Sequence, residues 1–399
     1  MQNQYKKTVN ACFVGYIVQA TVNNFVPLLF LTFNKSFNIP LSQITLLVTF
    51  NFGMQLLVDL ASVVFVDKIG YRASMVLAHG SAALGLMLLP VLPRLLPSPF
   101  VGILISVMLY AIGGGLLEVL VSPIVESCPS DNKEKAMSML HSFYCWGHVG
   151  VVLLSTAFFT LFGIENWSVL SVLWALIPLA NMLVFTRVPL VAPLGGEEKG
   201  QSLTQLLKTK VFWLLLIMML CAGASEQAVI QWASTFAEKG LGISKTLGDL
   251  AGPMSFAILM GLSRAFYGKR GDKINLDKFM IVSCLLCILS YLCISLSPVP
   301  IIGLIGLACC GLSVGIMWPG TISRAAAALP KGGTALFALL ALCGDLGCSA
   351  GPTLAGFAAR AFDDNIQKGI LCSICFPVIL LLGILLCKRK KGSTSSHHS

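Results

Sequence analysis

The chain consists of long apolar stretches separated by short polar loops. Each stretch is close to or longer than the roughly 20 residues that an α-helix needs to cross a bilayer. The apolar stretches run over 9–33, 43–66, 73–93, 100–126, 136–164, 167–187, 211–237, 247–269, 278–297, 299–325, 334–361 and 366–387. This pattern predicts an all-α membrane protein with twelve transmembrane helices.

The composition agrees with that pattern, because 56% of the residues are hydrophobic and only 11% are charged. An ordinary soluble domain has about 25% charged residues. A soluble globule of this length needs a polar surface that this chain cannot supply, which excludes a cytosolic enzyme, a secreted domain and a disordered protein. No phosphate-binding loop, nucleophile elbow or zinc-protease motif occurs. We therefore expect neither an enzyme nor a resident metal or cofactor.

The basic residues predict the orientation in the membrane. The formal net charge is +10, and most of the positive charge lies in short loops. With twelve helices both termini share one side, whose loops carry 20 of the 27 Lys and Arg residues; six lie opposite, and Arg264 lies inside a helix. Positively charged loops stay in the cytoplasm, so both termini are expected there, in an inner or plasma membrane. The distribution argues against a nucleic-acid-binding face.

The chain is expected to form two halves of six helices. The longest polar interruption, 188–210, is predicted to be a cytoplasmic linker between an N-terminal half (1–187) and a C-terminal half (211–399). A charged glycine turn at 67–72 follows the second apolar stretch, and a similar turn at 268–273 follows the eighth. Repeated halves with a central loop are typical of transporters whose site lies between the halves near the membrane midplane.

These turns carry a resemblance to a family. Asp67-Lys68-Ile69-Gly70-Tyr71-Arg72 and Gly268-Lys269-Arg270-Gly271-Asp272-Lys273 resemble the Gly-x-x-x-Asp-Arg-x-Gly-Arg-Arg loop of the major facilitator superfamily, although Val63 replaces the first glycine of one copy. Residues 347–356 are similar to the family's Gly-x-x-x-Gly-Pro bend. Physically they form a face of small residues for close packing, with a proline bend. The resemblance implies a secondary transporter that works by alternating access.

Ionisable side chains within the apolar stretches are the first candidates for function, because each costs about 2.5–3.5 kcal/mol at that depth. They are Asp59, Glu118, Glu226, Arg264 and Asp345. Glu118 is the strongest candidate, since it lies between three glycines and a proline near the middle of its stretch. A carboxyl group there can carry a proton or bind two sugar hydroxyls. The alternative is a protonated Glu118 that only hydrogen-bonds a neighbouring helix.

The surroundings of Glu118 narrow the resemblance. Leu-Glu-x-x-x-Ser-Pro at 117–123 resembles the fourth helix of the fucose permease group of sugar:proton symporters, and the sequence around Asn23 and Asn24 resembles its first helix. His141 and Tyr144 fall where that group places side chains towards the sugar. The resemblance implies a sugar site lined by Asn23, Asn24, Glu118, His141 and Tyr144.

Two departures from that group concern the proton path. Asn24 stands where the group has an acid, and Ser122 stands where it has an amide. A path with two carboxylates therefore cannot be transferred as it stands. Asp59, from the helix expected beside that of Glu118, either supplies the second acid or contacts a base at the gate.

The second half carries its own polar residues. Glu226, Gln227, Gln231 and Trp232 lie on adjacent turns of one predicted helix. Amides and a carboxyl group suit sugar hydroxyls, and an indole suits the C–H face of a sugar; hydrogen bonding between helices is the alternative. Trp318 occupies the position that Ser122 has in the first half, which makes it a sugar platform or a core aromatic.

The remaining charged candidates are assigned to an inner gate. Asp67 and Arg72 lie in the first charged turn, and Arg264 lies near the cytoplasmic end of the eighth helix. For Arg264 an ion pair that closes the gate is preferred over contact with the substrate. Asp345, in the eleventh helix, faces the cavity or pairs with Arg264 or Arg324.

These observations predict a proton-coupled symporter of a small polar solute, a monosaccharide, that acts as a monomer. Na⁺ is the alternative coupling ion. Two other functions remain open. Efflux of amphipathic compounds is disfavoured by the amides and carboxyl groups, and a non-transporting sensor is disfavoured by the short tails.

Overall fold

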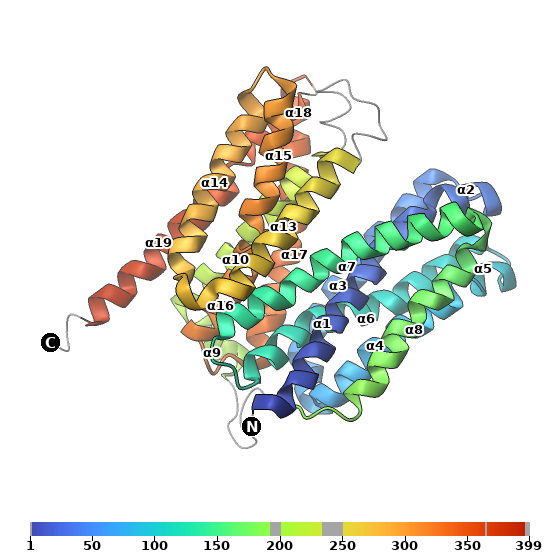
Figure 1. The fold of residues 1–399 in the computed structure, drawn as a ribbon, viewed down its shortest axis with the longest axis horizontal. Helices are drawn as coiled ribbons and strands as arrows, with labels where there is room; N and C mark the ends of the chain where they lie inside the picture. Colours follow the sequence, from blue (N-terminus) through green and yellow to red (C-terminus); the bar gives the residue numbers. More distant parts are fainter. Residues whose placement is uncertain (1, 192–200, 234–249, 364, 396–399) are drawn as a thin grey trace. The chain divides into compact units, whose positions relative to one another are not determined.

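We describe the protein from a computed structural model that describes residues 2–191, 201–233, 250–363 and 365–395. Every element within these ranges is a helix (Figure 1). Residues 192–200 of the predicted linker lie outside the described residues. So do residues 234–249, which include the end of the seventh predicted helix and the start of the eighth.

Ten of the described helical spans are long and apolar enough to cross a membrane. They are Gln4–Leu29, Leu46–Ile69, Pro99–Ser127, Lys133–Phe162, Ile164–Phe185, Lys210–Ile230, Leu276–Leu296, Ile301–Ala328, Gly333–Ala361 and Ile366–Cys387. Two further helices, α4 (Tyr71–Leu88) and α13 (Ser255–Arg270), occupy the third and eighth predicted stretches. The ten spans and these two helices match the predicted stretches one to one, which confirms the all-helical membrane fold.

The helices fall into two compact units. Unit 1 comprises Met1–Asp131, Phe143–Gly200 and Gly333–Ala338, and unit 2 comprises Asn132–Ser142, Gln201–Gly332 and Leu339–Ser399. The start of α7 (Lys133–Phe162) therefore packs within unit 2, and the first turns of α17 (Gly333–Ala361) pack within unit 1.

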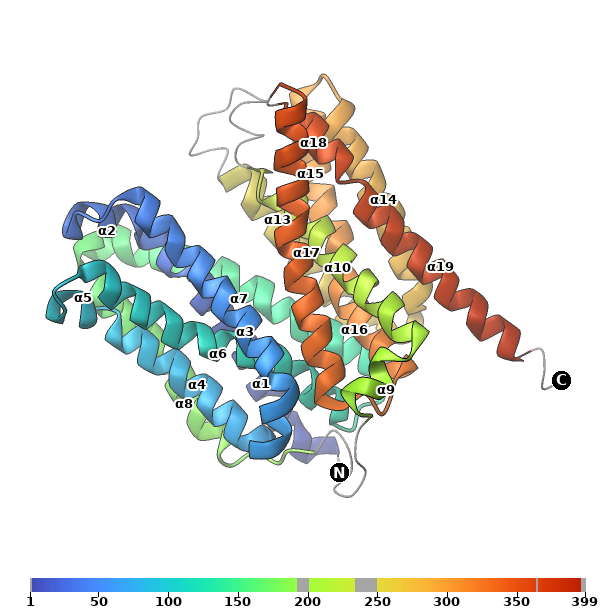
Figure 2. The same ribbon diagram turned by 180° about the vertical axis from the view of Figure 1, so that it is seen from behind.

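Unit 1 is organised around α6 (Pro99–Ser127), which packs on α1 (Gln2–Asn24), α3 (Leu41–Ile69) and α4. Glycines of α6 allow the close approach. A Cβ on Gly113 would lie 2.5 Å from the carbonyl oxygen of Ala78 in α4, and one on Gly115 would lie 3.1 Å from the Cα of Gln55 in α3. The helix α8 (Trp167–Phe185) covers α4 on its other side (Figure 2).

Helices α3 and α6 run in the same direction. The short helices α2 (Phe30–Phe37) and α5 (Leu92–Leu95) precede them in the chain and lie at the same end of unit 1 (Figures 1 and 2). Both long helices start at that end. If a residue of α3 contacts a residue of α6, the residues that follow each of them by the same number of positions therefore lie at about the same height along the two helices.

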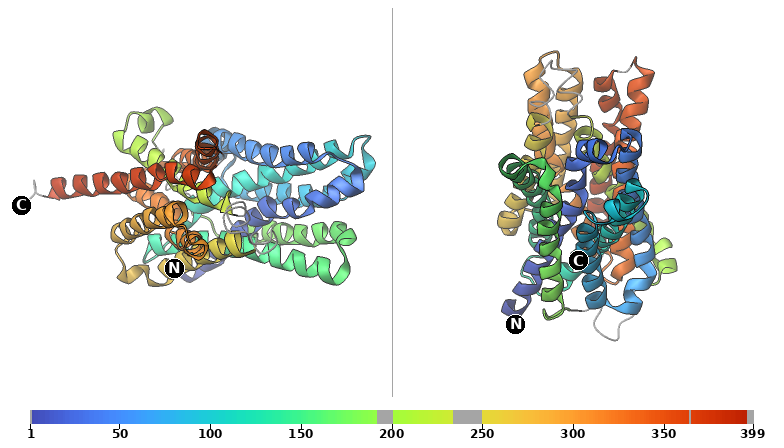
Figure 3. Two further views of the ribbon diagram at one scale, coloured as in Figure 1. Left: turned by 90° about the horizontal axis from the view of Figure 1, so that it is seen from above. Right: turned by 90° about the vertical axis from the view of Figure 1, so that its right-hand side faces the viewer.

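Unit 2 contains α10 (Lys210–Ile230), α13, α14 (Leu276–Leu296), α15 (Pro300–Val314), α16 (Met317–Ala328), α18 (Ile366–Cys372), α19 (Cys375–Ser395) and most of α17. Helices α14 and α15, drawn in orange, stay side by side in all views (Figures 1 to 3). A Cβ on Gly306 of α15 would lie 2.9 Å from the side chain of Ile294 in α14, so this pair is also closely packed.

The glycines of α17 form a packing face, as the sequence predicted. A Cβ on Gly347 would lie 2.0 Å from the carbonyl oxygen of Leu220, and one on Gly351 would lie 2.5 Å from that of Ala224. Both carbonyls belong to α10. Small residues at this spacing let two helix backbones meet directly.

One helix of unit 2 is broken near its middle. The span Ile301–Ala328 consists of α15, which ends at Val314, and α16, which begins at Met317. In a continuous helix the carbonyl of Gly315 would accept the N–H four residues later, but that residue is Pro319, which has none. The Gly315 carbonyl is therefore available to a side chain.

The α10–α17 contact can be tested by adding one methyl group. Gly347→Ala should lower the free energy of unfolding by about 1–3 kcal/mol, because the backbones of α17 and α10 must separate. Thermal unfolding of the purified protein measures the change. Gly53→Ala is the matched control, since a Cβ there meets nothing within 4 Å. Equal stability of the two variants would contradict the packing assignment.

Candidate functional site

Glu118 of unit 1 is bound by a side chain from α1. Its Oε2 accepts a hydrogen bond of 2.7 Å from the Nε2 of Gln19. One turn further along α6, the hydroxyl of Ser122 lies 3.1 Å from that of Tyr16 on α1. Asn23, one turn beyond Gln19, accepts bonds from α3. The seam between α1 and its neighbours is thus polar over several turns.

Helix α3 contributes a polar stripe, which consists of Asn51, Gln55, Asp59 and Ser62. Their spacing places them on one helix face, and all four are buried. The Nδ2 of Asn51 and the Nε2 of Gln55 donate to the Oδ1 of Asn23 at 3.2 Å and 2.9 Å. The stripe therefore continues the polar seam of α1 onto α3.

Asp59 and Glu118 lie at the same level of two packed helices. Gln55 of α3 packs against Gly114 and Gly115 of α6. Asp59 follows Gln55 by one turn, Glu118 follows Gly115 by about one turn, and the two helices run in the same direction. Asp59 has no exposed surface. Unit 1 thus places two carboxyl groups at the same level of neighbouring helices.

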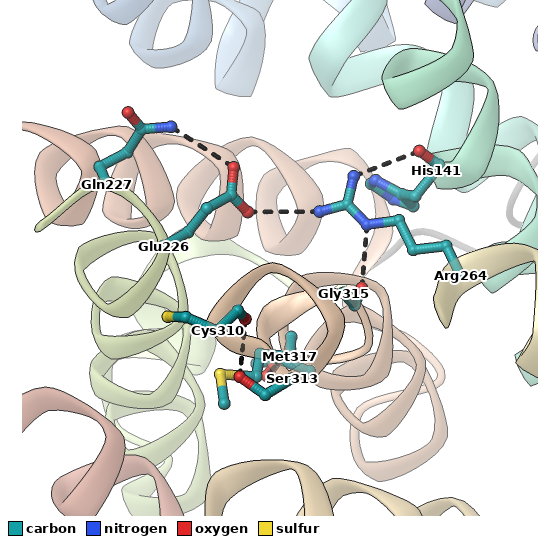
Figure 4. Close-up of polar contacts among 9 residues, drawn as sticks. His141, Glu226, Gln227, Arg264, Cys310, Ser313, Gly315 and Met317 are labelled. Atoms are coloured by element: carbon teal, nitrogen blue, oxygen red, sulfur yellow. Dashed lines mark hydrogen bonds and ion pairs between the residues drawn. The ribbon is translucent and has the colours of Figure 1, made fainter. Parts of the chain in front are cut away.

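Unit 2 is centred on the buried guanidinium of Arg264 in α13 (Figure 4). Its Nε donates to the Gly315 carbonyl at the helix break over 2.9 Å, and its Nη1 donates to the carbonyl of His141 over 3.2 Å. Its Nη2 lies 3.3 Å from the Oε2 of Glu226 on α10. In addition, the hydroxyl of Ser138 donates to the backbone oxygen of Arg264. Arg264 therefore connects α13, α10, the α15–α16 break and the start of α7.

The polar residues of α10 form a short chain that leads away from Arg264. The Nε2 of Gln227 donates to Glu226 Oε1 at 3.4 Å, and the Nε2 of Gln231 donates to Gln227 Oε1 at 3.1 Å. Gln231 is exposed, whereas Glu226 is mostly covered. Trp232 donates its indole N–H to the carbonyl of Pro352 in α17 at 3.2 Å. The structure brings Glu226, Gln227 and Gln231 together and ties Trp232 to α17.

The remaining substrate candidates have varied surroundings. Asn24 donates its Nδ2 to the carbonyl of Ala20 in its own helix, at 2.8 Å. The ring of Tyr144 meets that of Tyr16 edge-on, with centroids 6.5 Å apart. Trp318 packs on Gly344 of α17. His141 is buried, and its carbonyl serves Arg264.

The gate candidates Asp67 and Arg72 contact different parts of unit 1. Asp67, near the end of α3, accepts a hydrogen bond of 2.6 Å from the hydroxyl of Thr334 at the start of α17, and that hydroxyl also lies 2.7 Å from the Tyr71 hydroxyl. Arg72 instead donates to the carbonyls of Phe185 and Val188, at 2.7 Å and 2.9 Å. Arg72 thus caps the end of α8, where a cation suits the exposed carbonyls.

The second charged turn makes a contact of the same kind within unit 2. Lys135, at the start of α7, pairs with Asp272, and the hydroxyl of Tyr267 donates to Glu134 Oε2 at 2.9 Å. The hydrogen bond from Lys135 lowers the pKa of Asp272 below its ordinary value. Asp272 therefore stays ionised at neutral pH, and its pairing with Lys135 is lost only as the pH falls through that lowered pKa.

The sequence leaves Asp345 either facing the cavity or pairing with Arg324 or Arg264. The structure pairs Arg324 with Asp277 and Arg264 with Glu226. Asp345 lies on α17 next to Gly344, which packs against Gly223 of α10. The gate role of Asp345 stays a prediction.

Sequence reasoning missed several partners of the polar candidates. They are Gln19, Asn51, Gln55, Thr334 and Tyr71. Two signals were present in the sequence. Asn51, Gln55 and Asp59 repeat every four residues within an apolar stretch, and Gln19 precedes Asn23 by one turn. Such spacing marks a polar helix face, but it does not say which helix covers that face.

Comparison with known proteins identifies the family and the fold. The model of the Major Facilitator Superfamily matches residues 11–352. No curated protein matches the chain. Solved structures match its fold across almost its whole length.

The E. coli fucose:proton symporter FucP is one of them, with 16% identity over 96% of this chain and 99% of that chain and a TM-score of 0.82. The proton:xylose symporter XylE, bound to 6-bromo-6-deoxy-D-glucose, matches with 12% identity over 95% of both chains and a TM-score of 0.79. The human organic anion transporter MFSD10 matches with 15% identity over 95% of this chain and 99% of that chain and a TM-score of 0.71.

The chain belongs to the Major Facilitator Superfamily. It is therefore a multi-pass membrane protein and a secondary transporter of a small-molecule substrate, as the resemblance of its sequence implied. This family consists of transporters rather than enzymes, which agrees with the absence of catalytic motifs.

The contact between Asp67, Tyr71 and Thr334 can be tested by an isosteric change. Thr334→Val keeps the shape but removes the hydroxyl that binds both partners, so the free energy of unfolding should fall by about 1–3 kcal/mol. Chemical or thermal unfolding in detergent measures it. Thr353→Val is the control on the same helix, because the Thr353 hydroxyl is exposed and donates to the Ser349 carbonyl of its own helix. If Thr353→Val lowers the free energy of unfolding as much as Thr334→Val does, the Thr334 contact does not contribute specifically to stability.

Proposed function

We propose that the protein is a proton-coupled symporter of a small polar solute, a monosaccharide. The observation that carries the proposal is the pair of carboxyl groups in unit 1. Glu118 is hydrogen-bonded by Gln19, and Asp59 lies at the same level on the helix packed beside it. Carboxyl groups held inside a membrane-spanning helix bundle are the residue type that carries protons in transporters.

The two acids give the proton path that the sequence left incomplete. Asn24 of α1 stands where the resembled symporters have an acid, and its amide bonds its own helix. Asp59 supplies a carboxyl group from α3 instead. Protonation of Glu118 would weaken its charge-assisted bond from Gln19 and so link the proton to the contact between α1 and α6. We propose H⁺ as the coupling ion on this basis.

Sugar chemistry is supported by the residue types in both units. Asn23, Asn24, Glu118, His141 and Tyr144 supply one set of polar groups, and Glu226, Gln227, Gln231, Trp232 and Trp318 supply the other. Hydroxyl groups need several donors and acceptors, and aromatic rings suit the C–H face of a sugar. The fold is shared with transporters whose names record fucose:proton and proton:xylose symport.

The remaining parts of the proposal concern architecture and orientation. The halves 1–187 and 211–399 would rock about the site. The protein would lie in the inner or plasma membrane, with both termini in the cytoplasm. Asp67, with its bond to Thr334, would close the gate, together with Arg72, Arg264 and Asp345. The transporting species would be a monomer.

Proton coupling predicts separate outcomes for accumulation and exchange. Glu118→Gln keeps the shape and the ability to bond Gln19 but cannot titrate. In proteoliposomes it should abolish uphill accumulation driven by a pH gradient while sparing exchange of labelled for unlabelled sugar. Asp59→Asn should behave in the same way.

The control for this experiment is Glu165→Gln, which changes an exposed acid in the short 3-10 helix Ile164–Asn166. It should accumulate solute like the unmodified protein. Accumulation against a gradient by Glu118→Gln in response to a pH jump would show that Glu118 does not couple transport.

Sugar contact from both halves predicts a loss of affinity on each side. Removing a side chain that hydrogen-bonds a bound sugar hydroxyl costs about 1–3 kcal/mol, so Asn24→Ala and Gln231→Ala should each weaken binding by roughly five- to 150-fold. Equilibrium binding of labelled sugar to the purified protein measures both. Asn166→Ala, which changes an exposed amide at the end of the 3-10 helix Ile164–Asn166, should leave affinity unchanged. If one of the two variants binds normally, the site assignment of its half is wrong.

A further inference from the structure

A short amphipathic helix lies at the start of unit 2. Helix α9 (Leu203–Leu207) directly precedes α10, and a capping box between Ser202 and Gln205 fixes its first turn. Leu206 is fully buried and anchors α9 to the unit. Seen from above, the yellow-green segment that holds α9 and the start of α10 projects sideways from the other helices of unit 2 (Figure 3). Its outer surface is therefore open to the surroundings.

Four large apolar side chains form an exposed row across α9 and α10. Leu203, Leu207, Trp213 and Ile217 are 40% to 51% exposed. Leu203 and Leu207 lie one turn apart on α9, and Trp213 and Ile217 lie one turn apart on α10. The indole N–H of Trp213 donates to the carbonyl of Leu207 at 2.8 Å and so joins the two pairs. We call these four residues the α9–α10 row.

The α10 end of the row points away from the polar residues of unit 2. Glu226 follows Ile217 by nine positions, which is about two and a half turns and places the two on opposite sides of α10. Ile217 belongs to the membrane span Lys210–Ile230 and Trp213 lies in its first turn. The exposed face of α10 therefore meets lipid, and Trp213 stands where the span begins.

The charged residues beside the row are lysines. Lys208 follows the last residue of α9, and Lys210 is the first residue of α10. Both are exposed, and the sequence 201–213 contains no acidic residue. Tryptophan rings favour the level of the lipid headgroups, and lysines near a helix end extend their ammonium groups to the same level. The charge and the apolar row thus fit one surface, that of a membrane with negative headgroups.

We infer that the α9–α10 row lies in the membrane interface and, together with Lys208 and Lys210, binds an acidic phospholipid. An acyl chain packs along Trp213 and Ile217, and the headgroup phosphate accepts N–H groups of the two lysines. A zwitterionic headgroup brings its own cation and gains less from these lysines. The inference concerns a surface apart from the proposed sugar site and does not depend on the transported solute.

Fluorescence quenching on the full chain in lipid vesicles tests the inference. The vesicles contain phosphatidylcholine and phosphatidylglycerol, one of which carries bromine near the headgroup end of its acyl chains, and bromine quenches tryptophan on contact. The difference between the unmodified protein and Trp213→Phe isolates the emission of Trp213. This emission should be quenched more strongly by the brominated acidic lipid. A lysine near the surface contributes about fivefold in affinity, so the preference should reach about 25-fold.

Two pairs of lysines separate a local site from a general effect of charge. Lys208→Gln and Lys210→Gln should each reduce the preference for phosphatidylglycerol about fivefold, and the double variant should bind the two lipids almost equally. Lys273→Gln combined with Lys278→Gln is the control. It removes the same charge from exposed positions of unit 2, where no described apolar side chain within two positions is exposed. This control should keep the full preference.

Three results would overturn the inference. Trp213 that is quenched by iodide in the water but not by brominated lipid would place the row outside the membrane. Trp213 that is quenched by lipid only after the protein is diluted in the membrane would show that a second copy of the chain covers the row. Equal quenching by both lipids in the unmodified protein, or a preference that survives in the double lysine variant, would leave no acidic-lipid site.

Discussion

A polar group inside a membrane-spanning bundle has no water to bind, so each must find its partner within the protein. This constraint accounts for the arrangement of both units. In unit 1, Gln19 binds Glu118, and Asn23 receives two amides from α3. In unit 2 a proline frees the Gly315 carbonyl, and Arg264 takes it. The residues that are expensive to bury are therefore also the ones that connect helices.

The fold was largely predictable from the sequence, since span length and apolar composition are local properties. The apolar stretches corresponded to the described helices, and the spacing of Gly347 and Gly351 correctly indicated a packing face. The candidates Glu118, Glu226 and Arg264 were found by their cost in a bilayer. Their partners were not found, because periodicity gives the polar face of a helix and leaves the neighbouring helix unspecified. The contact of Arg264 with Gly315 also needed the consequence of Pro319 to be traced across two helices.

The two units solve the problem of burying charge in different ways. Unit 1 holds acids among amides and hydroxyls, where a proton can neutralise a carboxyl group. Unit 2 holds a permanent cation, which only an anion can neutralise. This asymmetry restricts the coupling mechanisms open to the protein more than the shared family fold does.

The backbone contact between α10 and α17 has a mechanical consequence. Gly347 and Gly351 bring the α17 backbone against the carbonyls of Leu220 and Ala224, so few side-chain rotamers are available for rearrangement there. Trp232, just beyond the end of α10, donates a further hydrogen bond to the carbonyl of Pro352 in α17. These contacts hold α10 and α17 together as one rigid pair of helices, and Glu226 belongs to that pair. Spectroscopic probes on α10 and α17 would keep a constant separation through the transport cycle, which provides an internal ruler for motions elsewhere in the molecule.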